Sequence, residues 1–292
     1  MASLKEVKGR IATVNNTRKI TSAMKMVASA KLHKAQGAIT NMLPYERRLH
    51  GLLSNLLGGG EVLIWNTPRE VKRVALVVFS SNSSLCGGFN ANVIKHATQW
   101  LDEYQTLGKD NILLYPVGKK VADALSKMGY AVQGNFQHLA DKPSFAEAAE
   151  LAQGLMNLFT QGDVDRVELL YNHFKSTASQ ILTREVYLPM ASEVCHPERS
   201  EGSLVHPQET DYILEPSREE LLETLLPKVL RMKLYTVLLD SNASEHAART
   251  MAMQIATDNA DGLLQELTLM YNKTRQQAIT SELLDIVGGS MM

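Results

Sequence analysis

Two long helical patterns at opposite ends of the chain set the strongest limit on its fold. One runs over about residues 3–57 and the other over about residues 217–287, and residues 5–44 and 236–270 contain no aromatic side chain. A lone helix of this length cannot bury its own apolar stripe, so the two ends must pack on each other or on a partner. The sequence therefore predicts an elongated molecule with a mechanical role.

Both patterns open on a sequence that is typical of a helix start. Ser3-Leu4-Lys5-Glu6 and Ser217-Arg218-Glu219-Glu220 are capping boxes. Apolar residues follow each start in alternating steps of three and four, which is typical of a coiled coil. Pro44 is expected to kink the first helix, and Pro227 is expected to kink or restart the second.

The middle of each apolar seam is rich in Ala and Met, which allow close helix approach and fill gaps. Antiparallel pairing matches these blocks if paired residue numbers sum to roughly 280. Leu4 would then lie near Ala278, and residues 279–287 would project alone. A compact helical bundle is the alternative, but nothing else in the chain is helical enough to complete one.

Between the two ends the apolar period changes to that of an α/β domain. The expected strands lie at 74–79, 112–117, 167–171 and 181–188, with a short one beginning at Ala131-Val132. The expected helices lie at 91–107, 119–128 and 144–162, and a capping box at Ser144 opens the last of them. Alternating strands and helices predict a mostly parallel sheet with helices on its faces.

The expected fold class is therefore α/β, in which a long antiparallel two-helix coiled coil carries a central Rossmann-like domain. The predicted parts are an N-terminal coiled-coil helix at 1–60, the α/β domain at 70–190, a linker loop at 191–216 and a C-terminal coiled-coil helix at 217–292. The linker is expected because prolines stand among polar residues there.

Composition limits the function classes. The formal net charge is −1, so the chain as a whole has no bulk attraction for nucleic acid or anionic lipid. A basic run over residues 5–34 leaves such binding open as an alternative, although it lacks the aromatic residues on which single strands stack. Two cysteines far apart fit a reducing compartment, and no apolar run reaches the length of a membrane span.

The central domain was a candidate enzyme, but its sequence carries little chemistry. There is no phosphate loop of the G-x-x-x-x-G-K-[ST] type and no G-x-G-x-x-G after the first strand. Cys86 has no evident base beside it, and Cys195, His196 and His206 lack a fourth zinc ligand at suitable spacing. The sequence predicts no catalytic, cofactor or metal site, and a small-molecule enzyme stays as an alternative that requires a pocket above the Cys86 turn.

Several motifs make the ends specific. Residues 16–28 (NTRKITSAMKMVA), 244–249 (SEHAAR), 256–260 (ATDNA) and 271–282 (YNKTRQQAITSE) resemble the gamma subunit of F-type ATP synthases, and so does the turn at 85–90 (LCGGFN). The resemblance covers essentially the whole chain.

The resemblance implies a role and partners. The coiled coil would stand inside a ring of three alpha and three beta subunits, and the α/β domain would lie against the epsilon subunit and the membrane c-ring. Proton or sodium flow would turn that ring, and this chain would carry the rotation to the catalytic beta subunits without catalysing anything itself. It would be a peripheral membrane protein on the cytoplasmic side of a bacterial inner membrane, without direct insertion and without a nucleic-acid partner.

The same resemblance places candidate contact residues. Those expected to face beta-subunit loops are Met24, Lys25, Arg249, Arg275, Gln276, Thr280 and Glu282. Tyr212 and Glu215 are candidates for contact with the rotor ring or the epsilon subunit. The turn at Ser81-Asn82-Ser83-Ser84 departs from the family, which has an acidic and a basic residue there, so a charge role for this turn is in doubt.

Overall fold

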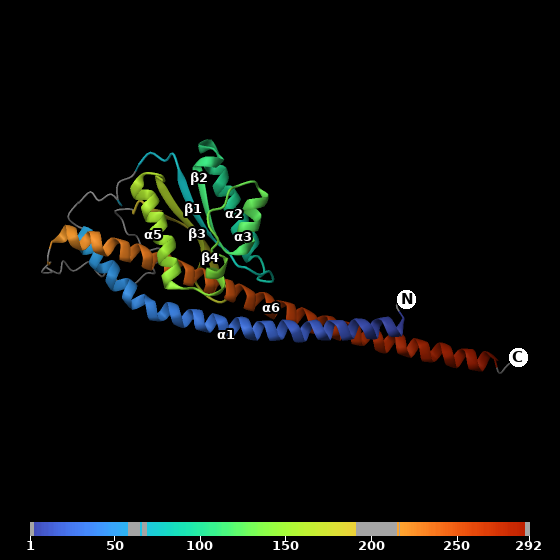
Figure 1. Cartoon of the computed structure of the whole chain (residues 1–292). Coiled ribbons are helices and arrows are strands. Elements are labelled where there is room, and N and C mark those ends of the chain that lie inside the picture. Colours follow the sequence, from blue (N-terminus) through green and yellow to red (C-terminus); the bar gives the residue numbers. More distant parts are fainter. Residues whose placement is uncertain (1–2, 58–64, 66–68, 191–214, 216, 290–292) are drawn as a thin grey trace.

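The computed structural model describes residues 3–57, 65, 69–190, 215 and 217–289. Helix α1 (Leu4–Leu57) and helix α6 (Arg218–Gly289) run antiparallel along most of the molecule, and the α/β domain lies beside one half of them (Figure 1). Figure 1 also shows the C-terminal part of α6 extending past the N-terminus of α1. The predicted coiled coil and its projecting end are therefore confirmed.

The helix starts and the proline sites differ in how well they were predicted. The Ser3 and Ser217 hydroxyls each accept a hydrogen bond from the amide three residues on, at 3.2 and 3.3 Å, as a capping box requires. Pro44 and Pro227 both lie inside continuous helices, so the predicted restart at Pro227 is wrong. Packing of the surrounding leucines Leu53, Leu56, Leu222 and Leu226 holds the helices together there.

The register of the coil is visible in contacts between the two helices. Arg18 Nη1 donates to Asp261 Oδ1 at 2.9 Å, and the Thr21 and Thr257 hydroxyls lie 2.9 Å apart. The paired numbers add up to 279 and 278, close to the predicted value. Toward the domain the small residues meet, in the buried cluster of Leu32, Ala35, Ala243 and Ala247. Small side chains let the two backbones approach closely at this level.

The α/β domain is built on a four-stranded sheet. Its strands β1 (Val74–Phe79), β2 (Ile112–Val117), β3 (Arg166–Phe174) and β4 (Gln180–Leu188) have the order β2-β1-β3-β4. The first three strands are parallel and β4 returns antiparallel to β3. The mostly parallel sheet is confirmed, but the strand predicted at Ala131-Val132 is only an isolated bridge from Val132 to Leu114.

Helices cover both faces of the sheet. Helices α2 (Phe89–Glu103) and α3 (Lys119–Lys127) pack on one face, where their apolar residues join those of Val74, Leu76 and Val78. Two short 3-10 turns, η1 (Gln105–Leu107) and η2 (Lys109–Asn111), connect α2 to β2. On the other face lie α4 (Gln137–Asp141), α5 (Phe145–Gln161) and part of α6.

The capping box predicted at Ser144 is wrong in its detail. Ser144 does precede α5, but its side chain makes no capping hydrogen bond. The Oε2 atom of Glu147, the expected second partner, lies against Nε2 of His138 in α4 instead. A partner from another element therefore displaces the local interaction that the sequence pattern indicates.

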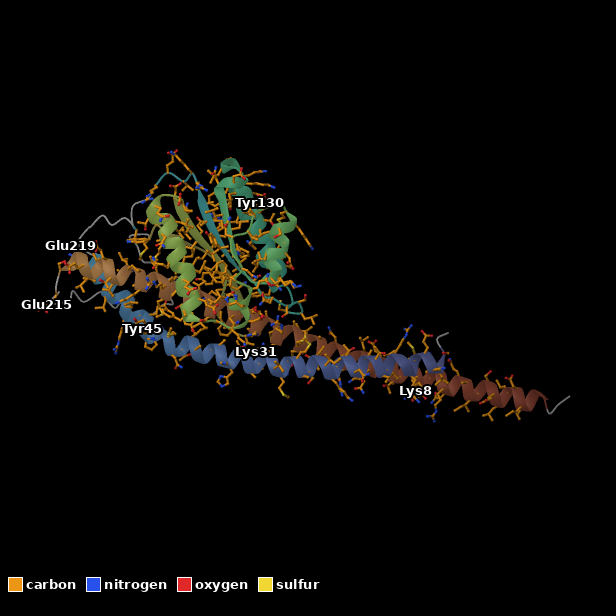
Figure 2. All side chains as sticks on the ribbon, in the orientation of Figure 1. Lys8, Lys31, Tyr45, Tyr130, Glu215 and Glu219 are labelled. Atoms are coloured by element: carbon orange, nitrogen blue, oxygen red, sulfur yellow. The ribbon has the colours of Figure 1, made fainter. Side chains whose placement is uncertain are left out.

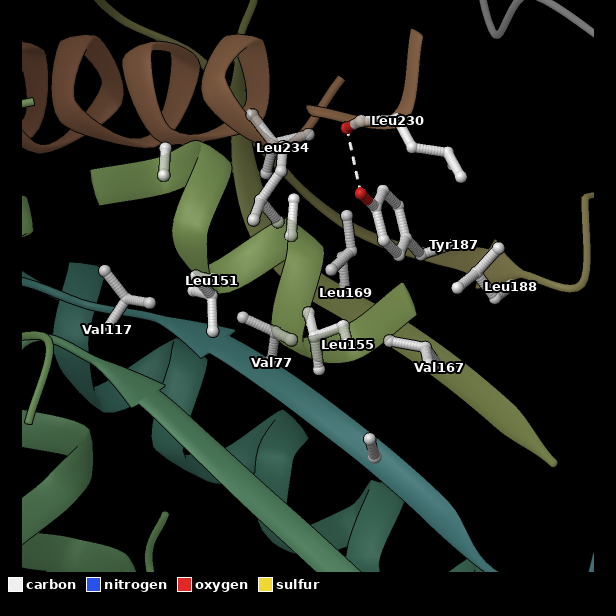
Figure 3. Packing of buried hydrophobic residues seen from close by; sticks show 14 of the residues in the cluster. Val77, Val117, Leu151, Leu155, Val167, Leu169, Tyr187, Leu188, Leu230 and Leu234 are labelled. Atoms are coloured by element: carbon white, nitrogen blue, oxygen red, sulfur yellow. Dashed lines mark hydrogen bonds between the residues drawn. The ribbon is translucent and has the colours of Figure 1, made fainter. Parts of the chain in front are cut away.

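The face shared by α5 and α6 joins the domain to the coil. Leu151 and Leu155 of α5 point toward Val77, Val167 and Leu169 of the sheet (Figure 3). From the coil, Leu230, Leu234, Val237 and Leu238 of α6 enter the same buried cluster. The Tyr187 hydroxyl donates to the Leu230 carbonyl oxygen at 2.8 Å, and burial raises the pKa of Tyr187. The C-terminal helix is thus part of the core of the domain as well as half of the coil.

Candidate functional site

One segment of α6, residues 240–249, is enclosed by the rest of the protein, and we call it the collar. Seven successive residues, 241–247, are buried, which a helix on a surface never shows because its outer side faces solvent. Helix α1 covers one side through Leu32 and Ala35, and the domain covers the rest. Five of the seven residues are polar or charged: Ser241, Asn242, Ser244, Glu245 and His246.

The polar side chains of the collar are bonded to different elements of the domain. Asp240 accepts a hydrogen bond from the Phe174 amide at 2.7 Å, and its other oxygen lies 2.6 Å from His173 Nδ1 at the end of β3. The Asn242 amide donates to the Ala140 carbonyl of α4 at 2.7 Å. The Ser244 hydroxyl donates to the Asn172 carbonyl of β3 at 2.8 Å. Each bond satisfies a group that would be costly to bury alone.

An ion pair closes the far end of the collar. Arg249 Nη1 lies 2.5 Å from Glu245 Oε1, and Arg249 Nη2 donates to the Ser83 hydroxyl at 2.7 Å. Burial raises the pKa of Glu245, and the charge of Arg249 opposes that rise. The Arg249 side chain is only 12% exposed. Its guanidinium therefore binds the turn of the α/β domain within this chain.

His246 is the one buried histidine of the collar. Burial lowers the pKa of His246 to about 4, and the nearby positive charges of Arg249 and Lys31 lower it further. Asp141 acts in the opposite direction. The His246 Nδ1 atom has no hydrogen-bond partner among the described residues. The imidazole is consequently neutral at physiological pH, and a proton there would be a buried charge beside two cations.

The collar occupies the place where an open α/β sheet usually binds its ligand. In such folds the ligand lies outside the carboxyl ends of the strands, where the chain direction of the crossovers reverses. Here α6 crosses the ends of β1 and β3, and the space left beside Phe79, Ala140 and Asn242 is a cavity of about 10 Å³. Such a volume holds about one water molecule.

The alternative of a small-molecule enzyme needed a pocket above the Cys86 turn, and the structure contradicts it. Cys86 is 2% exposed, and an added Cβ on Gly87 would lie 3.7 Å from the Ala252 Cβ, so α6 rests directly on the turn. Within the described part of the chain, no group of three His, Cys, Asp or Glu side chains is placed to hold a metal ion. Cys195, His196 and His206 lie outside the described residues.

The contact residues expected from the family motifs lie at separate levels of the coil. Met24 and Lys25 of α1 are half-buried against the coil. Arg275, Gln276, Thr280 and Glu282 lie in the last part of α6, residues 271–289, which we call the tip, and all four are exposed. Arg249 lies apart from them in the collar. The structure therefore brings together only the four residues of the tip.

The tip also exposes large apolar side chains that a solvated helix would not carry together. They are Ile279, Leu283, Leu284, Ile286 and Val287, between 45% and 67% exposed. An apolar surface of this kind marks an interaction site.

At the opposite end of the molecule Glu215 is exposed near Glu219, whereas Lys8 lies toward the tip (Figure 2). Tyr212, the other candidate at the Glu215 end, lies outside the described residues.

Comparisons with known proteins identify the family. A family model described as ATP synthase matches residues 3–291. The ATP synthase gamma chain of Phocaeicola vulgatus is 67% identical over 293 residues, with 100% of each chain covered. The chain belongs to the ATP synthase gamma-chain family. It is also similar to the gamma chain of Flavobacterium johnsoniae, at 48% identity over 99% of this chain and 98% of that one.

Solved structures of this family share the fold. A chain of the Tetrahymena thermophila mitochondrial ATP synthase central stalk and c-ring is 25% identical, with a TM-score of 0.56 over 81% of this chain and 99% of that one. A chain of the Euglena gracilis mitochondrial ATP synthase gives a TM-score of 0.67 at 22% identity, over 99% of this chain and 93% of that one. The gamma-family chain is thus a central-stalk subunit of a rotary ATP synthase and is itself non-catalytic.

Two further findings complete the site. None of the described helices combines the length and hydropathy that crossing a membrane requires.

The sequence motifs placed Arg249 beside a beta subunit and did not single out Asp240, Asn242 or Ser244 as site residues. The available signal was the polar residues at 240–242 and 244–245, on either side of Ala243, which interrupt an otherwise apolar and small-residue seam.

Proposed function

We propose that this chain carries rotation from an ion-driven membrane ring to the catalytic beta subunits of its ATP synthase. The length of the coil supports this role, because the 72 residues of α6 span about 108 Å at 1.5 Å per residue. A single helix paired with a second one over most of that length is stiff enough to transmit torque. The ion that turns the ring is a proton or a sodium ion.

The tip of α6 enters a sleeve made of three alpha and three beta subunits. The observation that carries the proposal is the projection of this exposed apolar tip beyond the start of α1. Apolar side chains in such a position are stable in water only when a partner covers them. The exposed Arg275, Gln276, Thr280 and Glu282 then contact loops of the beta subunits, and Arg275 offers a fork that fits a carboxylate.

The middle of the coil contacts beta subunits through a weaker surface. Met24 and Lys25 are half-buried, and the basic residues of α1 around them face solvent on its outer side. Attraction between exposed charges is modest and screened by salt, so it guides a rotating surface without holding it. Arg249 contributes to the beta contact only with the small part of its side chain that the collar leaves exposed.

The opposite end contacts the rotor ring and the epsilon subunit. Glu215 is exposed there. Tyr212, which lies outside the described residues, stays a candidate for the same contact on the ground of the family motif alone. The Tetrahymena relative is described together with a c-ring, which supports a ring contact for this chain as well. The curated relatives are bacterial, which supports a peripheral position on the cytoplasmic side of a bacterial inner membrane.

The proposal is tested in the assembled complex, in inverted membrane vesicles. Arg275→Ala combined with Gln276→Ala removes the charged and amide contacts of the tip. Loss of such hydrogen bonds should lower ATP-driven ion pumping by about tenfold. The matched control is Gln254→Ala, because the Gln254 amide bonds only to Asp258 on the same helix, at 2.7 Å. Equal pumping by the tip variant and the control would show that the tip does not contact the catalytic subunits.

A further inference from the structure

The proposed role requires that torque applied to the α/β domain reaches the coil through the contact between them. Two kinds of contact are present. Leu230 and Leu234 of α6 pack into the apolar core of the domain, and the collar makes hydrogen bonds to β3 and α4. Apolar packing is non-directional, so it resists separation of the two parts more than rotation of one against the other. Hydrogen bonds weaken steeply when their angle changes, so they resist rotation.

The collar bonds hold α6 from two sides. Asp240 and Ser244 are one helical turn apart and both bind the end of β3. Asn242, which binds α4, stands about 200° round the helix from Asp240 at 100° per residue. A turn of α6 about its own axis in either direction therefore breaks bonds on both sides together. The freed groups would have no water to replace their partners, because Asn242 and Ser244 are 8% and 0% exposed.

Three side chains, buried Asn242 and Ser244 and the 14% exposed Asp240, thus act together where the seam otherwise needs only small residues. A seam of alanines packs closely without polar groups, and Ala243 and Ala247 show that it does so here. Buried polar side chains are weak contributors to stability when an apolar residue of the same shape can replace them. Their presence in the collar calls for a role in orientation.

We propose that Asp240, Asn242 and Ser244 are positioning residues that fix the rotational angle of the coil relative to the α/β domain. This inference rests on the proposed function, since an angle matters only if rotation is transmitted. The hydrogen bonds that the structure describes for all three run to other elements of this chain. They act by preventing slip between the domain, which receives the rotation, and the tip, which delivers it.

The test uses the complete ATP synthase with Asn242→Ala and Ser244→Ala in this chain. ATP hydrolysis and ATP-driven ion pumping are measured together, without and with an opposing ion gradient. Hydrolysis should stay within twofold of the unaltered complex. The number of ions pumped per ATP should fall at least threefold against the gradient and less without it, because slip grows with load. A merely structural role would lower both activities by the same factor at every load.

The matched control removes two side-chain hydrogen bonds that lie within α6. Thr250→Ala and Gln254→Ala do so, because the Thr250 hydroxyl bonds to the His246 carbonyl and the Gln254 amide to Asp258. The control should pump like the unaltered complex at every load. Unchanged ions per ATP in the collar variant would overturn the inference. Absence of pumping by the unaltered complex would instead count against the proposed function.

A disulfide between the α/β domain and α6 tests whether a different link can restore pumping in the collar variant. The Cβ position of Gly87 lies 3.7 Å from the Ala252 Cβ, which is within the range for a disulfide. Gly87→Cys with Ala252→Cys, in a background with Cys86→Ser and Cys195→Ser, ties the turn after β1 to α6. Oxidation should restore pumping in the collar variant and reduction should remove it again. If the double collar variant fails to assemble, Ser244→Ala alone is measured, and a loss that does not depend on load there also overturns the inference.

Discussion

The collar and the tip are parts of one continuous helix, yet the protein treats them in opposite ways. In the collar, seven successive residues are buried and most of them are polar. In the tip, every described side chain from residue 275 onward is exposed and several are large and apolar. The first pattern puts polar groups inside and the second puts apolar groups outside. Neither pattern is explained by the stability of this chain alone.

The contrast shows where each part finds its partner. Three collar side chains, those of Asp240, Asn242 and Ser244, form hydrogen bonds within the chain, to backbone groups of β3 and α4. Tip side chains are exposed, and among the described elements only α6 itself extends past the start of α1 (Figure 1). Under the proposed function, other subunits cover them. One end of the helix is therefore a fixed joint, and the other is a contact surface completed on assembly.

The largest expected effect comes from replacing one leucine beside the collar and one leucine in the tip by alanine. Equal effects of the two substitutions would contradict the contrast between collar and tip. Leu234, next to the collar, is 1% exposed, and Leu284 in the tip is 67% exposed. Leu234→Ala should lower the free energy of unfolding of the purified chain by about 2–5 kcal/mol, because it leaves a cavity. Leu284→Ala should change it by less than about 0.5 kcal/mol. Urea unfolding measures both, and a similar loss in the two variants would mean that the tip is packed within the isolated chain.

An effect of intermediate size is expected in the pH dependence of the free energy of unfolding, because the collar contains the buried His246. The pKa of His246 is about 4 in the folded chain, below the ordinary value of 6.5. The unfolded chain therefore binds the extra proton first, and the free energy of unfolding falls as the pH drops from 6.5 toward 4. For a difference of this size the loss is about 3 kcal/mol.

His246→Gln should remove that pH-dependent part, since glutamine stays neutral. The raised pKa values of Asp240 and Glu245 act in the opposite direction and are common to both proteins. Unfolding by urea at pH 7 and pH 4.5 gives the comparison, with His33→Gln on the exposed side of α1 as control. Parallel pH profiles of His246→Gln and the unaltered chain would show that His246 is not buried as described.

The smallest effect concerns the part of the coil between collar and tip. The ion pair of Arg18 and Asp261 joins α1 to α6, but its side chains are 41% and 47% exposed. Arg18→Ala should cost less than about 1 kcal/mol of unfolding free energy, and salt should reduce the difference further. Unfolding at low and high salt measures this. A large loss that salt does not change would indicate that the pair is much less solvated than its exposure implies.

Much of the fold could be predicted because it follows from periodicity. The antiparallel register follows from matching two blocks of small residues, and contacts such as that of Thr21 with Thr257 confirm it. The mostly parallel sheet follows from alternating strands and helices with short links, whereas its strand order was not predicted. The sequence-based predictions were wrong where a contact with another element replaced the local interaction that the sequence pattern indicates. Glu147 lies against His138 rather than capping α5, and Val132 makes one bridge where a strand was expected.

The site was harder to predict because the collar exists only in three dimensions. Its bonds join residues up to 166 positions apart, such as Arg249 and Ser83, which no sequence window contains. Arg249 illustrates the same limit, because nothing in the sequence indicates that its guanidinium contacts Ser83 of the α/β domain. Its expected contact with a beta subunit stays a prediction. The turn at residues 81–84 lacks the family's charged residues, yet Ser83 still supplies a hydroxyl for that contact.

The insertion of the α/β domain between two halves of one coil has a consequence for synthesis of the chain. Helix α1 is translated before the α/β domain and α6 after it, so the two halves of the seam become available at different times. Until α6 emerges from the ribosome, Leu32 and Ala35 lack the alanines of α6 against which they pack. The core of the domain also lacks Leu230 and Leu234 until then. Such non-local pairing delays the completion of folding, and the apolar surface that stays exposed until then favours aggregation. The nascent polypeptide therefore cannot complete either the coil or the core of the domain until α6 has been translated.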